Sequence, residues 1–345
     1  MSGHRPWREI RRKAHRCTLY YQATPATSYW RVALPAKYLP AKMHPAPQLA
    51  VVNHGDDKPL EFPDVVNDTA IMQFPGDQGS AVVCMAMGAT GRKFFVECDD
   101  NYLDQGDPLW RKRSNWGQKI GATAHTVQGH RWIVEHSHGV IVTTRALADY
   151  YGQHNDNVHI CRNSIDPDDW PEPGERDETF RIGWYASQSH DRDEAMVRKA
   201  LAWASRQPNV EIVNIGLDPG WEISRRWIGW REDFRSLRPE LGKLDIGVAP
   251  LVGTPMTRFR SDLKVLEYAM GGAMPFVQAE EPYHEWRDVE FARMCATPAE
   301  WVDAIKWGVR NRDEVRARAK QAREFVLTNR TFHTEINRWR EAIGS

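Results

Sequence analysis

The order of short apolar runs and helical segments is the feature that most restricts the fold of this 345-residue chain. The runs are rich in β-branched and aromatic side chains, which predicts buried strands. Helical patterns separate several of them, and a strand, a helix and a further strand joined by short connections form a right-handed parallel unit. The pattern therefore predicts an α/β fold. The predicted strands are 17–22, 49–53, 70–74, 93–98, 139–144, 158–162, 180–186, 210–216, 244–250 and 273–279.

A change in composition divides the chain. Residues 164–178 read SIDPDDWPEPGERDE, with three prolines and mostly acidic or turn-forming residues, which is typical of a linker. After it the alternation of strands and helices resumes, and the last part is almost entirely helical. Two successive parallel-sheet domains place ligands at the carboxyl ends of their strands. We expect an N-terminal domain over 1–166, a linker over 167–179, a C-terminal domain over 180–330 and a final helix in 331–345.

The composition excludes several classes of protein. No apolar run approaches the roughly 18 residues of a membrane-spanning helix, and no secretory leader is visible. Five cysteines without a CxxC pair argue against a disulfide framework or a zinc knuckle and are typical of a cytoplasmic protein. Lys and Arg together balance Asp and Glu at 46 each, which disfavours a dedicated nucleic-acid-binding protein.

The charges are unevenly spread along the chain. Residues 1–45 hold nine Lys or Arg against Glu9 alone, whereas residues 46–110 hold eleven Asp or Glu. This asymmetry indicates either two solvated faces or a basic arm that touches an acidic surface, a membrane or nucleic acid.

Common catalytic motifs are absent from the sequence. We find no GxGxxG, no GxxxxGK[ST], no GxSxG and no HExxH. Asp191 and Asp193 resemble a metal-binding DxD pair, but they fall in the first turn of a predicted helix, 191–206. Acidic residues are favoured there by the helix dipole, so we interpret both as helix-capping residues.

The segment 245–283 carries the clearest chemical signal. A buried strand leads into a loop with cations and hydroxyls, and a helix begins at Ser261–Asp262, with Ser261 as the expected N-cap. A helix N-terminus beside Arg and Lys side chains is an anion site. The residues expected around such an anion are Arg258, Arg260, Ser261 and Lys264.

Glu267 follows Lys264 by one helical turn and shares its face of the predicted helix. A carboxylate in this place can accept hydrogen bonds from the two neighbouring hydroxyls of a ribose or another sugar. Alternatively, Lys264 and Glu267 form an i,i+3 salt bridge worth about 0.2–0.5 kcal/mol.

Four ordered segments resemble one enzyme family. DIGVAPL with SDLKVLEYAMGGAMPFV resembles the second-domain signature of the GT-B glycosyltransferases of the family-4-like group. Residues 97–103, 139–166 and 181–193 resemble further family segments in the same order, so the likeness covers most of 90–285. The chain looks most similar to the divergent members that bacteria and bacteriophages encode. The resemblance implies two Rossmann-like, doubly wound parallel-sheet domains facing across a cleft, with C-terminal helices that cross back.

The resemblance also implies roles for individual residues. Glu267 would bind the ribose of a nucleotide, whereas Phe259 stands where the family has a Glu that contacts the donor sugar. The residues that would surround the donor diphosphate are Ser187, Gln188, His190, Arg258, Arg260, Ser261 and Lys264.

Two carboxylates of the first half are the catalytic candidates. Asp99 and Asp100 follow the strand 93–98 and could orient an acceptor hydroxyl or act as a base; turn capping is the alternative. Trp221, Trp227 and Trp230 cluster where family members form the base pocket, so they either stack on a base or pack on the surface.

These observations predict a glycosyltransferase that uses a nucleotide-diphosphate sugar as donor. Fixed cations and a helix N-terminus can stabilise the leaving diphosphate, so we expect neither a metal nor a further cofactor. Retention of anomeric configuration is implied by the resemblance alone. The acceptor is expected to be a protein, a glycan or a modified DNA base, and the location the cytoplasm, the host's if a phage encodes the chain. The alternatives are a degenerate sugar- or nucleotide-binding protein and, disfavoured by the missing GxGxxG, a nicotinamide-dependent oxidoreductase.

Overall fold

The computed structural model describes most of the chain and divides it into two compact units. The described residues are 17–21, 25–39, 41–45, 68–76, 78–103, 127–187, 190, 192–218, 220–221, 223, 225–231 and 233–344. Unit 1 comprises the described residues of 1–161 together with those of 336–345, and unit 2 comprises those of 162–335.

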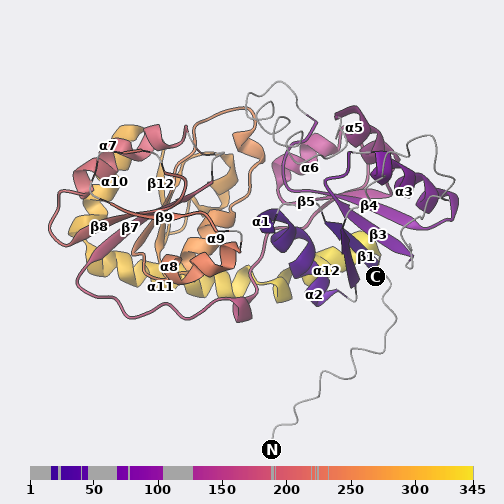
Figure 1. The fold of residues 1–345 in the computed structure, drawn as a ribbon. Coiled ribbons are helices and arrows are strands. Elements are labelled where there is room, and N and C mark those ends of the chain that lie inside the picture. The colour runs from indigo at the N-terminus through magenta and orange to yellow at the C-terminus, as the bar shows by residue number, and fades with distance from the viewer. Residues whose placement is uncertain are drawn as a thin grey trace, which may run out of the picture. The chain divides into compact units, whose positions relative to one another are not determined.

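Unit 1 contains a six-stranded sheet in the order β2-β1-β3-β4-β5-β6 with every pair parallel (Figure 1). Strands β3, β4 and β5 are almost wholly buried, as strands of a parallel sheet covered on both faces must be. Its elements are β1 (Cys17–Tyr21), α1 (Pro25–Ser28), the π-helix η2 (Tyr29–Ala33), α2 (Leu34–Tyr38), β2 (Ala41–Pro45), β3 (Thr69–Gln73), α3 (Gln78–Ala89), β4 (Lys93–Cys98), α5 (Val127–His136), β5 (Gly139–Val142), α6 (Arg145–Tyr151) and β6 (Val158–Ile160).

Unit 2 contains a second six-stranded parallel sheet, in the order β12-β11-β10-β7-β8-β9. Its elements are η3 (Pro167–Asp169), β7 (Phe180–Ala186), α7 (Glu194–Ala204), β8 (Val210–Gly216), β9 (Arg226–Gly229), η5 (Phe234–Leu237), α8 (Arg238–Leu241), β10 (Ile246–Ala249), η6 (Thr257–Phe259), α9 (Leu263–Met270), β11 (Met274–Gln278), η7 (Glu281–Trp286), β12 (Arg293–Cys295), α10 (Pro298–Arg310) and α11 (Arg312–Asn329). Helix α12 (Phe332–Ile343) begins in unit 2 and continues into unit 1.

The helical segment after β1 buries an arginine in unit 1. Residues 29–38 form the π-helix η2 followed by α2, and Pro35 stands in the first turn of α2, where its missing N–H is tolerated. Arg31 of η2 is 1% exposed and forms an ion pair with Glu97 of β4, Nε to Oε1, at 2.6 Å. The guanidinium also lies 4.9 Å from the ring centroid of Trp339. A side chain of α12 therefore completes the core of unit 1.

A close contact fixes β7 against β10 in unit 2. A Cβ added to Gly247 of β10 would lie only 2.1 Å from the Tyr268 ring of α9. Because glycine leaves this room, the Tyr268 hydroxyl reaches the sheet, donates to the carbonyl of Val248 at 2.9 Å and accepts from the amide of Tyr185 at 3.0 Å. Helix α9 is thus held against the carboxyl ends of both strands.

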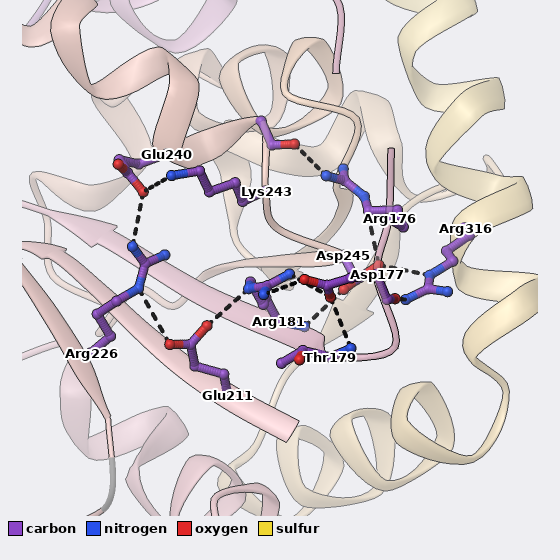
Figure 2. A network of polar contacts seen from close by, with 11 residues as sticks. Arg176, Asp177, Thr179, Arg181, Glu211, Arg226, Glu240, Lys243, Asp245 and Arg316 are labelled. Atoms are coloured by element: carbon purple, nitrogen blue, oxygen red, sulfur yellow. Dashed lines mark hydrogen bonds and ion pairs between the residues drawn. The ribbon is translucent and has the colours of Figure 1, made fainter. Parts of the chain in front are cut away.

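A network of ion pairs crosses the amino-terminal edge of the second sheet (Figure 2). The buried carboxylate of Asp245 accepts from the amide of Arg181 at 2.8 Å and from Nε of Arg316 at 2.9 Å. Arg176 lies 3.7 Å from the same carboxylate and donates to the carbonyls of Gly242 and Gly272. These contacts bind part of the proline-rich segment to the sheet of unit 2.

The two ends of unit 2 lie beside each other. Ile165 pairs with Thr331 in a parallel bridge, and the amide of Ile165 donates to the carbonyl of Arg330 at 2.8 Å. The Arg330 side chain donates to the carbonyl of Asn163 at 3.1 Å. The chain therefore enters and leaves unit 2 at one place.

Several elements differ from the prediction. The structure adds the strands β2, β9 and β12 to those predicted from the sequence. The strand expected at 49–53 lies outside the described residues.

Candidate functional site

The strand order of unit 2 reverses between β7 and β10. The chain proceeds from β7 to β8 and β9 on one side, and β10, β11 and β12 lie on the other side. The carboxyl ends of β7 and β10 are Ala186 and Ala249. In doubly wound sheets, ligands bind at such a reversal, outside the carboxyl ends of the strands.

A chain of hydrogen bonds joins the loops that follow these two strands. Asp193 Oδ2 lies 2.6 Å from Nδ1 of His190, and Nη1 of Arg260 donates to Nε2 of His190 at 2.9 Å. Asp193 Oδ1 accepts from the amide of Val252, in the loop after β10, at 2.8 Å. His190 and Arg260, both expected at the site, are therefore brought together.

The capping role expected for Asp193 is wrong. Asp193 precedes α7, but its side chain makes no capping hydrogen bond to that helix. Its carboxylate instead joins the two loops, a function that requires partners distant in sequence. Asp191 and Gln188, also named from the sequence, lie outside the described residues.

The N-terminus of α9 also differs from expectation. Asp262, not Ser261, occupies the N-cap position, and its side chain does not cap the helix. Both of its oxygens face Arg330, at 2.6 and 2.9 Å, and the indole of Trp286 donates to Oδ2 at 2.9 Å. Ser261 Oγ accepts from the side-chain amide of Asn163 at 2.8 Å. Of the described residues, neither Ser261 nor Asp262 caps the helix with its side chain, so the first turn of α9 presents amides of the kind that bind an anion.

Lys264 and Glu267 lie behind this terminus on one face of α9. Lys264 Nζ donates to the carbonyl of Tyr185, at the end of β7, and lies 4.9 Å from the Tyr185 ring centroid. Burial lowers the pKa of Lys264, while the nearby Glu267 carboxylate opposes that shift. Burial likewise raises the pKa of Glu267, which Lys264 and Arg238 oppose. Among the described residues the two form no ion pair within 4.0 Å, so the simple i,i+3 salt bridge is not what the structure contains.

Phe259 and Arg258 do not extend this cluster. The Phe259 side chain is 2% exposed and belongs to the hydrophobic interior. Arg258 is exposed and its guanidinium lies 4.5 Å from the centroid of the Phe259 ring. The position where a second glutamate was sought thus holds a core residue.

Aromatic side chains border the same sheet edge. The rings of Tyr185 and Trp230 stack with centroids 5.9 Å apart and planes within 6°. Trp227 and Trp230 are 51% and 47% exposed, and both flank Gly216, whose φ of +92° favours glycine. Trp221 is different: it is 5% exposed and stacks on Trp184 in the core, so its role is packing.

The catalytic candidates of unit 1 lie just beyond β4. Asp99 is half-buried and its Oδ1 accepts from the Tyr102 hydroxyl at 2.6 Å. Asp100 is 7% exposed, and its Oδ1 accepts from the amide of Asn101 at 2.9 Å. Asp100 therefore makes the kind of contact expected if it caps the turn, which was the alternative to a catalytic role. The Asp99 carboxylate instead accepts a hydrogen bond from a side-chain hydroxyl.

A buried histidine supports this turn and was not found from the sequence. Nε2 of His130, in α5, lies 3.2 Å from the Tyr151 hydroxyl, and Nδ1 of the same ring contacts the carbonyl of Pro75. The Tyr151 hydroxyl donates to the carbonyl of Asp100 at 3.2 Å. A single histidine on a helix has no spacing signal, so only the structure reveals this chain of contacts.

The opposite edge of unit 2 has an open pocket of about 700 Å³. It is lined by charged groups of the network in Figure 2, among them Arg181, Glu211 and Arg226. Arg181 pairs with Asp177 and Glu211, and Arg226 pairs with Glu211. Because these charges neutralise one another, we assign the pocket no ligand.

In the part of the chain that the structure describes, His, Cys, Asp and Glu side chains form no group of three or more that could hold a metal ion. Within the same residues, every helix is too short or too polar to cross a bilayer.

Comparisons with known proteins connect this fold with glycosyltransferases. No family model and no curated protein sequence matches the chain. Solved structures do match. A glycosyltransferase from Rickettsia africae has 10% identity and a TM-score of 0.65, with 95% of this chain and 98% of that chain covered. Anabaena HepE, solved with UDP and glucose, has 11% identity and a TM-score of 0.62, with 96% and 100% covered.

Staphylococcus aureus TarM is a third similar structure, with 14% identity, a TM-score of 0.59 and 80% of this chain covered. This chain spans only 55% of the length of TarM. These likenesses confirm the expected fold class, an α/β fold with two parallel-sheet units. The roles of the individual site residues and the likeness to phage-encoded members stay predictions.

Proposed function

We propose that the protein transfers a sugar from a nucleoside-diphosphate donor to an acceptor hydroxyl or amine. One observation carries the proposal: Arg260 and Lys264 lie near the N-terminus of α9, with Glu267 one helical turn further on. Lys264 contacts the end of β7 and Arg260 contacts the loop after it, where the strand order reverses. A diphosphate at this helix terminus would meet first-turn amides and two cations.

The fixed charges supply the chemistry that a leaving nucleoside diphosphate needs. Negative charge grows on the leaving phosphate as the sugar departs, and preorganised cations stabilise it without a divalent ion. The Glu267 carboxylate, buried among Lys264, Arg238 and Tyr185, would accept hydrogen bonds from the ribose hydroxyls. The exposed face of Trp230 would stack on the base. That Anabaena HepE was solved with UDP supports uracil as the first base to test.

Asp99 is the proposed acceptor-side group. Its carboxylate is half-buried and already bound by the Tyr102 hydroxyl, so it can orient an acceptor hydroxyl or take its proton. We propose a retaining reaction, by resemblance, with a protein, a glycan or a modified DNA base as acceptor. Cytoplasmic action is part of the same proposal.

A buried Phe259 favours one second candidate. No carboxylate contacts the donor sugar from that position, so a protein that binds the nucleotide or its sugar conjugate without turnover is the alternative. Tight binding of a nucleotide sugar with no release of nucleoside diphosphate would support it.

The test is a thermal-shift and calorimetric titration with UDP, GDP, ADP and their glucose conjugates, with EDTA or with Mg²⁺. A ligand at a hundredfold its Kd adds about 2.7 kcal/mol of stability. We expect one nucleotide to stabilise the protein equally in both media. Glu267→Gln should lower the affinity for that nucleotide, whereas Glu314→Gln, which alters an exposed carboxylate of α11, should leave it unchanged. A folded protein that binds none of these nucleotides would refute the proposal.

A further inference from the structure

We propose that Asp193 and His190 form a positioning pair that aims the Arg260 guanidinium at the donor diphosphate, with His190 neutral and not itself a phosphate ligand. The inference rests on the proposed function and assigns His190 a role different from the phosphate contact expected from the sequence.

The direction of the hydrogen bonds fixes the state of the imidazole. A guanidinium has donors only, so the 2.9 Å contact from Arg260 Nη1 requires Nε2 of His190 to be the acceptor. The ring proton therefore lies on Nδ1 and points at Asp193 Oδ2, 2.6 Å away. Both ring nitrogens are engaged by protein groups, and neither is left for a phosphate.

The carboxylate that orients the histidine is itself fixed. Asp193 is 7% exposed, and its second oxygen accepts from the Val252 amide at 2.8 Å. The loop after β7, the loop after β10 and Arg260, the residue that follows η6, are therefore joined in one line of contacts. A partner that sets the tautomer and angle of a histidine is how proteins hold a ligand-binding side chain in place.

The surrounding charges explain why the histidine must be neutral. Arg260 and Lys264 are both cations near the start of α9, and Arg260 contributes to lowering the pKa of Lys264. Among the described residues, the titratable groups close to them include Glu267, Asp193, Asp262 and the buried hydroxyl of Tyr283. A protonated His190 would turn an N–H toward the Arg260 N–H and add a third cation, which would push the guanidinium away.

The experiment is a double-mutant cycle on nucleotide affinity. The probe is whichever of UDP, GDP and ADP binds the wild type most tightly, titrated by calorimetry. We expect His190→Ala to weaken binding about tenfold and His190→Gln, whose side-chain oxygen can accept from Arg260, to recover most of the loss. If His190 acts through Arg260, then His190→Ala has no further effect in an Arg260→Ala protein.

His284→Ala is the matched control. His284 also pairs with a carboxylate three residues away, Glu281, at 2.9 Å, but both side chains are over 40% exposed. This variant should bind nucleotide as the wild type does.

A second measurement does not depend on the nucleotide. Nitrogen-15 NMR of the free protein should show His190 protonated at Nδ1 and not at Nε2, and Arg260→Ala should shift the Nε2 resonance.

The outcomes separate the two proposals. Additive losses in the cycle, or a proton on Nε2, would overturn the positioning role while nucleotide binding stood. Failure of the wild type to bind any of the three nucleotides would overturn the proposed function and this role with it.

Discussion

Replacing Asp245 by asparagine tests how the amino-terminal edge of the second sheet is stabilised. The carboxylate is buried and accepts two hydrogen bonds, from the Arg181 amide and from Nε of Arg316. Asparagine keeps the shape but offers one acceptor oxygen, so its NH₂ group must face one of these donors. It also removes the charge that balances Arg176 and Arg316 (Figure 2).

The magnitude follows from these contacts. A hydrogen bond to a charged group contributes about 1.5–3 kcal/mol, and breaking a buried ion pair costs about 3–5 kcal/mol. The guanidiniums of Arg176 and Arg316 are 15% and 27% exposed, so water recovers part of that loss. We expect Asp245→Asn to lower the free energy of unfolding by about 2–4 kcal/mol, or about 5–15 °C in Tm for a domain of this size.

The assay is chemical and thermal unfolding of the full chain, followed by tryptophan fluorescence. Asp233→Asn is the control, because Asp233 also pairs with an arginine, Arg235, but both side chains are more than half exposed. Its effect should stay within about 0.5 kcal/mol. Equal stability of the two variants would refute the reasoning that the buried carboxylate holds this edge together.

Three further predictions concern the site and its support. Gly247→Ala should destabilise unit 2 by about 1–3 kcal/mol or more in a denaturation series, because the new methyl group meets the Tyr268 ring; an unchanged midpoint would contradict the packing. Nucleotide affinity measured by calorimetry should rise from acid toward neutral pH, because the raised pKa of Glu267 means that its carboxylate forms at a higher pH than usual. The affinity should fall again in alkali, because the lowered pKa of Lys264 means that its positive charge is lost at a lower pH than usual. Glu267→Gln should abolish the acid limb, and its persistence would assign that limb elsewhere. Trp230→Ala should weaken binding of a nucleoside diphosphate by about 1–3 kcal/mol but leave binding of inorganic pyrophosphate unaffected. Equal losses of affinity for both ligands would exclude base stacking.

The buried strands could be predicted from the sequence, and the edge strands could not. Strand β10 is a continuous apolar run, and β7 is one from Ile182 onward, because both faces of a parallel sheet are covered. Strands β9 and β12 are short, partly exposed edges, so they lack that signal. Strand β9 lies in a polar segment rich in Arg and Trp, whose pattern does not predict a strand.

The site divides in the same way. Helical spacing places Lys264 and Glu267 on one face of α9, since that depends only on the local period. The bonds from His190 to Arg260 and from Asp262 to Arg330 join residues about seventy positions apart, and no local pattern encodes them. Serine is favoured at helix N-caps, which is why the sequence predicts Ser261 in that position. In the structure the Ser261 hydroxyl accepts a hydrogen bond from the Asn163 side chain instead.

The bridge between Ile165 and Thr331 has a consequence for the order of folding. Unit 2 is a closed insertion, whereas unit 1 is assembled from residues on both sides of it. Because residues 162–335 are one continuous stretch, unit 2 can fold as a unit of its own. The contact between Arg31 and Trp339 instead closes a loop that contains the whole of unit 2. Such non-local contacts form slowly in an unfolded chain, so a folded unit 2, which holds residues 165 and 331 together, shortens the loop that unit 1 must close.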